Sequence, residues 1–171
     1  IGEDPNHLGK IWTTLYRFFY QGHNLAKDVG NAISAIDTAL HDIVGKSTQK
    51  SVSDIMGGRI RDSITVYATG LYYVDDYALE PLLKEATTYA EQGFTGMKMK
   101  VGGLPLAIDA SRIKAVREII GPDVQLMFDA NEAYDPSTAI EFANMVAENN
   151  LRWFEEPCDS RDNIANKLVQ E

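Results

Sequence analysis

The pattern of apolar and polar positions divides the chain into a helical first part and an alternating second part. Apolar residues recur every three or four positions over residues 8–20 and 26–44, which predicts two amphipathic helices. Gly45 directly follows the second segment, where a glycine is typical of a helix C-terminus. A short helical turn is expected at 51–56. The sequence therefore predicts a helical region over residues 1–60.

From residue 61 onward, strand-like and helix-like segments alternate. Four runs rich in apolar, β-branched and aromatic residues predict strands. They lie at residues 64–69, 96–101, 124–128 and 151–154. Each run is followed by a segment with helical periodicity. These segments lie at about 80–91, 106–120, 136–148 and 161–170.

Strict alternation of such units is typical of a parallel sheet with helical crossovers. Both a doubly wound sheet and a (β/α)8 barrel satisfy this pattern. Neither GxGxxG nor GxxxxGK[ST] occurs in the chain, so nucleotide-binding versions of the sheet lose support. We therefore favour the first half of a (β/α)8-type barrel over residues 61–171.

Polar side chains gather at the carboxyl ends of three successive predicted strands. Two lysines one residue apart end the second strand, an aspartate and an asparagine one residue apart end the third, and two glutamates end the fourth. These residues are Lys98, Lys100, Asp129, Asn131, Glu155 and Glu156. Taken singly, each motif is more often a solvated face, a helix cap or a loop start. Three of them in phase with three strand ends indicate a site, because parallel barrels build active sites at this end.

The residue types suit one chemistry. Carboxylate oxygens such as those of Asp129 and Glu155 are the hard ligands that Mg²⁺ prefers, whereas zinc and copper favour nitrogen and sulfur. Two neighbouring lysines are expected to lower each other's pKa, because like charges and burial both disfavour the ammonium form. A neutral lysine can serve as a base near neutral pH. We therefore predict a Mg²⁺ site with a lysine base.

These motifs resemble the mandelate racemase/muconate lactonizing branch of the enolase superfamily. The matching stretches are Lys98-Met99-Lys100-Val101-Gly102, Asp129-Ala130-Asn131 and Phe154-Glu155-Glu156-Pro157. Residues 32–46, with the glycine-arginine segment 57–62 after them, resemble the part of the family's capping domain that leads into the barrel. The resemblance covers nearly the whole chain and is closest to the acid-sugar dehydratases.

The resemblance implies a domain division and a role for each residue. Residues 1–60 would be the helical part of an N-terminal α+β capping domain, and residues 61–171 the first four β/α units of the catalytic barrel. Enzymes of this superfamily use a lysine or histidine base together with Mg²⁺. The implied roles are Mg²⁺ ligation by Asp129 and Glu155, proton abstraction by Lys100, substrate-carboxylate binding by Lys98, and hydrogen bonds to substrate or ligands from Asn131 and Glu156.

The resemblance also implies a reaction. Abstraction of the proton α to a carboxylate gives an enediolate, and the dehydration of an acid sugar such as an aldonate or aldarate is the favoured outcome. A racemase or epimerase and a muconate-type cycloisomerase use the same half-site and stay open as alternatives. A non-catalytic metal-binding barrel fragment is a further alternative, although the intact motifs argue against it.

The extent of the match carries an expectation about the chain itself. In the family, the third metal carboxylate and the second acid/base group follow the segment matched here, so they are expected after Glu171. We therefore expect an internal fragment of a protein about twice as long, whose isolated 171 residues bind Mg²⁺ weakly and are inactive.

Composition narrows the partners. A formal net charge of −9 disfavours nucleic acid, because a phosphate backbone would be repelled. No apolar run approaches the roughly 20 residues that a membrane span needs. One cysteine, Cys158, and the lack of a visible signal peptide fit a cytoplasmic protein. The expected partner is a small carboxylate substrate, and a homo-oligomer is expected for the full-length protein.

Overall fold

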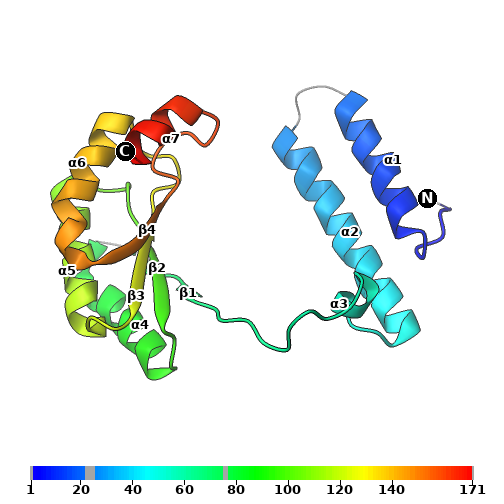
Figure 1. The fold of residues 1–171 in the computed structure, drawn as a ribbon, viewed down its shortest axis with the longest axis horizontal. Coiled ribbons are helices and arrows are strands. Elements are labelled where there is room, and N and C mark those ends of the chain that lie inside the picture. Colours follow the sequence, from blue (N-terminus) through cyan, green and yellow to red (C-terminus); the bar gives the residue numbers. More distant parts are fainter. Residues whose placement is uncertain (1, 22–25, 75–76, 171) are drawn as a thin grey trace. The chain divides into compact units, whose positions relative to one another are not determined.

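The chain forms two units, residues 1–64 and residues 65–171 (Figure 1). The computed structural model describes residues 2–21, 26–74 and 77–170. The first unit is helical, and the second contains a sheet with helices along one face.

The described part of the first unit, residues 2–21 and 26–64, contains three helices. They are α1 (Leu8–Gln21), α2 (Ala26–Thr48) and α3 (Val52–Ile55). Helix α2 continues through Gly45, so the predicted C-terminus at this glycine is wrong. A Cβ on Gly45 would lie 3.0 Å from the carbonyl oxygen of Lys50 and 3.6 Å from Ile55 Cδ1. The glycine therefore serves close packing of the following turn rather than the end of the helix.

Within its described residues, 65–74 and 77–170, the second unit contains four parallel strands in the order β1-β2-β3-β4. They are β1 (Ala68–Thr69), β2 (Gly96–Lys100), β3 (Gln125–Asp129) and β4 (Leu151–Glu155). The helices that alternate with them are α4 (Leu79–Glu91), α5 (Leu106–Ile120), α6 (Pro136–Val146) with the 3₁₀ turn η2 (Ala147–Asn149), and α7 (Asn163–Gln170). The predicted alternation around a parallel sheet is confirmed. Among the described helices of the chain, none is both long and apolar enough to cross a membrane.

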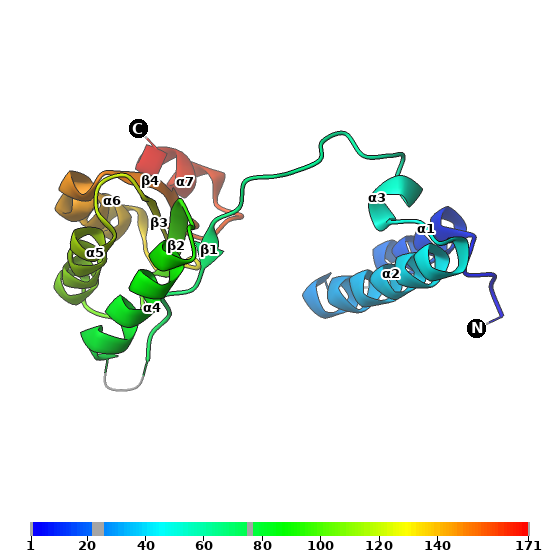
Figure 2. The same ribbon diagram turned by 90° about the horizontal axis from the view of Figure 1, so that it is seen from below.

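The core of the second unit lies between the sheet and three helices. Met97 and Met99 of β2 and Leu126 and Phe128 of β3 are at most 2% exposed. They pack with residues of α4, α5 and α6, which lie along one face of the sheet (Figures 1 and 2). Burying each such side chain contributes about 1.5–3 kcal/mol. Because strand residues alternate between faces, the residues between these apolar positions face the other side.

Strand β1 is shorter than its composition predicts. Only Ala68 and Thr69 pair with β2, through Met97 and Lys98. The preceding Ile64 and other apolar residues of the predicted run 64–69 are exposed, Ile64 by 71%. β-branched residues favour a strand only where a neighbouring strand and a packed face are available, and this stretch precedes the paired segment.

Helix α5 buries two charged residues and leaves two of its isoleucines exposed. Ile113 is fully buried as its spacing predicts, but Ile108 and Ile119 are 47% and 46% exposed. Asp109 and Arg112 are instead 0% and 3% exposed. Positions 109, 112 and 113 share one helix face at spacings of three and four residues, so the buried face continues through an ion pair.

Candidate active site

Strand register brings the predicted strand-end residues into one row. Lys100 of β2 is paired with Asp129 of β3, and Asp129 is paired with Glu155 of β4. Paired positions of a parallel sheet present their side chains on the same face, and Lys98, two residues before Lys100, shares that face. The row crosses the carboxyl ends of three neighbouring strands, on the face opposite the buried Met97 and Met99.

Lys98 lies between two carboxylates. Its Nζ donates to Glu155 Oε1 at 2.7 Å and to Asp129 Oδ2 at 3.3 Å. Burial lowers the pKa of Lys98, but its hydrogen bonds to Glu155 and Asp129 outweigh burial, so the pKa is raised. The expectation that the two lysines depress each other's pKa is therefore wrong for Lys98, because two carboxylates surround it.

Lys100 shares a carboxylate oxygen with Lys98. Its Nζ donates to Asp129 Oδ2 at 2.6 Å and to Asn131 Oδ1 at 2.6 Å. The same ammonium group lies 5.8 Å from the centroid of the Tyr72 ring, within the range of a cation–π interaction. Burial raises the pKa of Asp129, but hydrogen bonds from Lys100 and from the Asn131 N–H outweigh it and hold that pKa below its usual range.

Asn131 and Glu156 have left-handed backbone conformations. Their φ angles are 45° and 44°. The Asn131 N–H donates to Asp129 Oδ1 at 2.9 Å, and its Nδ2 donates to Glu156 Oε2 at a longer 3.4 Å. A left-handed non-glycine residue costs about 1–2 kcal/mol, less for asparagine, and such residues cluster at functional sites. The structure thus links all six predicted residues, with Glu156 attached by the weakest contact.

An aromatic cluster supports the row from the helix side. Phe128 and Phe154, each directly before a site carboxylate, have ring centroids 4.2 Å apart, and Phe142 of α6 lies 5.6 Å from Phe128. Well-packed neighbours restrict the strands that carry Asp129 and Glu155. The positions of the two carboxylates are therefore set by the core.

The donor set fits part of a Mg²⁺ site. The carboxylates of Asp129 and Glu155 converge on one positive charge, the Lys98 ammonium group. Oxygen donors of this kind suit Mg²⁺. Within residues 2–21, 26–74 and 77–170, no three His, Cys, Asp or Glu side chains are grouped so as to hold a metal ion. The two carboxylates can therefore supply two oxygen ligands.

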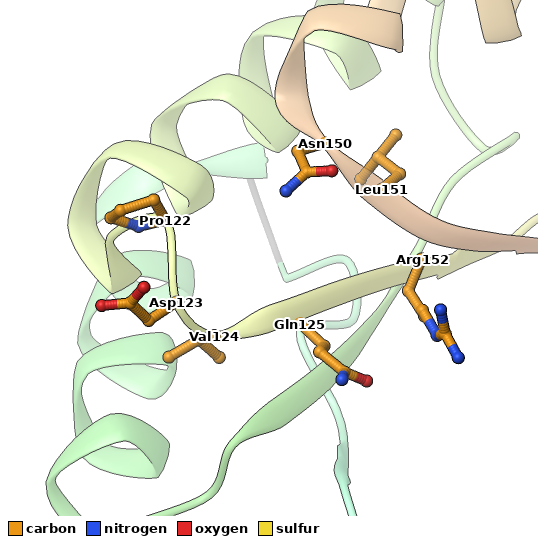
Figure 3. A pocket seen from close by; sticks show the side chains of 7 residues that line it. All are labelled: Pro122, Asp123, Val124, Gln125, Asn150, Leu151 and Arg152. Atoms are coloured by element: carbon orange, nitrogen blue, oxygen red, sulfur yellow. The ribbon is translucent and has the colours of Figure 1, made fainter.

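Cavities lie at both ends of the strands. One of about 340 Å³ borders Lys100, Asn131 and Tyr72 at the carboxyl ends. Another of about 400 Å³ lies at the amino ends of β3 and β4 (Figure 3). It is lined by Pro122, Asp123, Val124, Gln125, Asn150, Leu151 and Arg152. None of the predicted site residues lines this second cavity, so the first is the candidate substrate cavity.

Two residues near the site, Asp109 and Arg112, are not predicted by the sequence pattern. Tyr73 Oη donates to the Asp109 carboxylate, which also accepts from Arg112. The available signal was the Asp109-x-x-Arg112 spacing, which places both charges on the same helix face as the buried Ile113. Charged residues on a helix are usually solvated, so the pattern alone favoured the surface.

Family models match most of the chain. Residues 1–57 match the mandelate racemase/muconate lactonizing enzyme N-terminal domain, and residues 81–170 match the enolase C-terminal domain-like family. The chain belongs to the mandelate racemase/muconate lactonizing enzyme family of the enolase superfamily. The predicted family membership is confirmed.

The curated relatives of the chain include enzymes that act, to judge by their names, on sugar-derived acids or lactones, and also a hydrophobic dipeptide epimerase and an N-succinyl-L-Arg/Lys racemase. A D-galactarolactone cycloisomerase from Agrobacterium fabrum is 40% identical over 92% of this chain and 41% of its own length. An arabinonate dehydratase from Saccharolobus solfataricus is 36% identical over 92% of this chain and 42% of its own length. The chain thus spans less than half the length of these relatives.

Solved structures of the superfamily share the fold. The 3,6-anhydro-D-galactonate cycloisomerase from Zobellia galactanivorans aligns with a TM-score of 0.89 and 38% identity, over 99% of this chain and 46% of the other. A racemase from Streptomyces coelicolor A3(2) with bound magnesium aligns with a TM-score of 0.84 and 33% identity, over 99% of this chain and 46% of the racemase chain. The predicted fold class, half of a (β/α)8-type barrel with helices of the capping domain, is confirmed.

Proposed function

We propose that the complete protein carrying this chain removes the proton α to the carboxylate of an acid sugar and then expels a β-hydroxyl group as water. The single observation that carries the proposal is the row of Lys100, Asp129 and Glu155 in register across three strands, with Lys98 between the carboxylates. Two amines and two carboxylates on one face can supply a base, a cation for the substrate carboxylate and oxygen ligands for a metal ion, which are part of what enediolate formation needs.

Lys100 is the proposed base. Its side chain is 17% exposed, borders the cavity at the carboxyl ends of the strands and is oriented by Asp129 and Asn131. In its neutral form the amine accepts the substrate's α-proton. Lys98 is more deeply buried, with 10% of its side chain exposed, and its fixed positive charge would hold the substrate carboxylate.

Asp129 and Glu155 would hold Mg²⁺, as their oxygen donors allow. When bound, the ion supplies positive charge opposite the enediolate oxygens. The bound magnesium of the Streptomyces coelicolor racemase supports this assignment. Further ligands and the acid that assists departure of the hydroxyl are proposed to come from the rest of the complete protein.

The fate of the enediolate separates the candidate reactions. In dehydration, the C–O bond at the β-carbon breaks, water leaves, and the resulting enol becomes a 2-oxo-3-deoxy acid. The arabinonate dehydratase supports this outcome. Cycloisomerisation of a sugar-derived lactone is a second candidate, supported by the two cycloisomerases that share 40% and 38% identity with the chain.

A substrate screen tests the proposal. The complete protein is incubated with Mg²⁺ in D₂O and a panel of aldonates, aldarates and their lactones, and the products are identified by NMR. We expect at least one acid sugar to yield a 2-oxo-3-deoxy acid carrying deuterium at C3. A rearranged lactone or an epimer would assign the second step to cycloisomerisation or racemisation. The absence of both α-proton exchange and product across the panel contradicts the proposal and favours a non-catalytic barrel.

A further inference from the structure

A buried ion pair on α5 contacts the main chain behind the proposed base. Arg112 Nη1 donates to Asp109 Oδ1 at 2.8 Å and to the carbonyl oxygen of Lys100 at 3.0 Å. The other Asp109 oxygen accepts from the Gly102 N–H at 2.8 Å. One helix therefore holds both sides of the peptide segment in which β2 ends.

The same pair holds the loop after β1. Tyr73 Oη donates to the Asp109 carboxylate, with distances of 2.9 and 3.0 Å to its two oxygens, and accepts from the Gly103 N–H at 2.8 Å. The guanidinium carbon of Arg112 lies 4.3 Å from the centre of the Tyr73 ring. Arg112 Nη2 makes longer approaches of 3.4 and 3.5 Å to the carbonyl oxygens of Leu71 and Tyr72. Both strand ends thus share one partly buried network centred on Asp109 and Arg112.

The backbone at this point needs such partners. Beyond the ends of β1 and β2 the sheet ladder no longer pairs every N–H and C=O, and buried backbone groups left unpaired are costly. Leu71 is fully buried with a φ of 55°, so its conformation persists only because its neighbours determine it. A buried ion pair is a weak source of net stability, because desolvation offsets its Coulomb energy. What the pair does provide is hydrogen bonds to main-chain groups at both strand ends.

We propose that Arg112, Asp109 and Tyr73 are positioning residues that fix the carboxyl ends of β1 and β2 and thereby hold Lys100 in register with Asp129. None of the three hydrogen-bonds to the Lys100 amine. Arg112 holds the main chain at Lys100, Asp109 holds it at Gly102, and Tyr73, which also borders the candidate substrate cavity, holds it at Gly103. This inference rests on the proposed function in one respect, the assignment of Lys100 as the base.

Arg117 provides a matched control on the same helix. Its guanidinium group also donates to main-chain carbonyls, but at the amino ends of β3 and β4. The contacts are Nε to Asn149 at 2.9 Å, Nη1 to Val124 at 2.7 Å and to Gly121 at 2.8 Å, and Nη2 to Asn150 at 3.1 Å. An Arg→Lys change at either position keeps the charge and loses the fork of donors.

The test compares Arg112→Lys with Arg117→Lys in the complete protein with Mg²⁺. Backbone amide exchange followed by mass spectrometry needs no substrate. Arg112→Lys is expected to accelerate amide exchange at residues 70–73 and 100–103, and Arg117→Lys at 121–126 and 149–151. With the acid sugar identified by the screen, Arg112→Lys is expected to lower kcat about 100-fold with KM changed less than about threefold, whereas Arg117→Lys leaves both within about threefold.

Each other outcome overturns the inference. Accelerated amide exchange throughout the Arg112→Lys protein indicates a role in global stability alone. Local acceleration with an unchanged kcat shows that the network does not position the base. If the unmodified protein processes no acid sugar, the proposed function fails separately, and unchanged amide exchange at 100–103 then refutes the network's hold on Lys100.

Tyr73→Phe serves if Arg112→Lys does not fold, since it keeps the ion pair and the ring. It removes one hydroxyl group that bridges Asp109 and the Gly103 N–H. The same local acceleration is expected, with a smaller loss in kcat of about tenfold. A Tyr73→Phe protein with unchanged amide exchange at 100–103 and unchanged kcat overturns the inference.

Discussion

The two ends of the four-stranded sheet are held by the same helix with the same residue type, yet they are built differently. At the amino end, Arg117 donates only to main-chain carbonyls at the turns that precede β3 and β4. At the carboxyl end, Arg112 divides its donors between a buried carboxylate and the main chain of Lys100. The first arrangement closes turns, and the second holds a strand end that presents charged side chains.

Backbone strain alone does not distinguish the two ends. Asn150 at the amino end has a φ of 49°, close to the 45° of Asn131 and 44° of Glu156 at the carboxyl end. The difference lies in the side chains, because Asn131 bonds to Lys100 and reaches Glu156, whereas Asn150 ends a 3₁₀ turn. Strain indicates a functional edge only where the strained residues also carry an interacting polar network.

Removing each arginine's charge should separate the two ends most strongly. Arg112→Met leaves the Asp109 carboxylate buried without its cation, and we expect a loss of about 3–5 kcal/mol in the free energy of unfolding. Arg117→Met removes hydrogen bonds to carbonyls that water can partly replace, and we expect about 1–2 kcal/mol. Urea unfolding of the two variants of the complete protein measures the difference.

A double variant is the control for the charge argument. In Asp109→Asn/Arg112→Met neither position of the buried ion pair carries a charge, so part of the stability lost in Arg112→Met should return. Equal losses for the two single arginine variants, or a double variant no more stable than Arg112→Met, would contradict the proposed difference between the ends.

Glycine substitutions at the left-handed residues Glu156 and Asn150 should change stability less than the arginine substitutions do. Only the substitution at Glu156 should change activity. Glu156→Gly removes the backbone strain of a left-handed glutamate, but glycine also adds conformational entropy to the unfolded state. We expect a net gain of about 0.5 kcal/mol in the free energy of unfolding, together with a loss of activity. Asn150→Gly should change stability by less than about 0.5 kcal/mol and leave activity unaltered. Thermal unfolding and product formation from the acid sugar measure both properties. A Glu156→Gly protein that keeps full activity would show that this carboxylate plays no part in the site.

The smallest expected effect concerns the helix that begins at the carboxyl end. Asp135 caps α6, and its hydrogen bonds with Ser137 and Thr138 hold its pKa below the ordinary value of 3.8. A carboxyl group whose pKa is lower in the folded than in the unfolded state stabilises the fold at pH values above its unfolded-state pKa. This contribution is lost as the pH falls towards the folded-state pKa. Asp135→Asn keeps the cap acceptor without the charge, so the wild-type advantage in Tm over this variant should shrink below about pH 4. Asp135→Ala, which also removes the cap, should have a lower Tm than Asp135→Asn at every pH. A difference in Tm between the wild type and Asp135→Asn that stays constant with pH would contradict the assignment.

Local pattern predicted those features that depend on chain order and alternation. Lys98 and Lys100 had to share a face, and successive parallel strands had to bring Lys100, Asp129 and Glu155 to one edge. Strand β1 was predicted too long because propensity does not report whether a neighbouring strand is present. Gly45 was misread because its small size serves a contact with Lys50, which lies beyond its own helix turn.

The burial of Asp109 and Arg112 could not be predicted from the hydrophobic pattern, because it also depends on contacts with distant segments. Asp109 and Arg112 are stable in the interior only because they meet each other, Tyr73 and main-chain groups of two other segments. Asp109 and Tyr73, for example, are 36 residues apart in the sequence. The raised pKa of Lys98 depends on Glu155 in the same way, 57 residues away. Tertiary contacts of this kind decide whether a charged residue is buried.

Exchange of the substrate's α-proton with solvent in Lys100→Met tests the central claim most directly. The complete protein with Mg²⁺ is incubated in D₂O with the acid sugar from the screen, beside Lys114→Met, a change at an exposed lysine of α5. We predict that Lys100→Met slows the exchange by a factor of about 10²–10⁴, the usual contribution of a general base, and that Lys114→Met does not slow it. Exchange that proceeds at the wild-type rate in Lys100→Met would contradict the account.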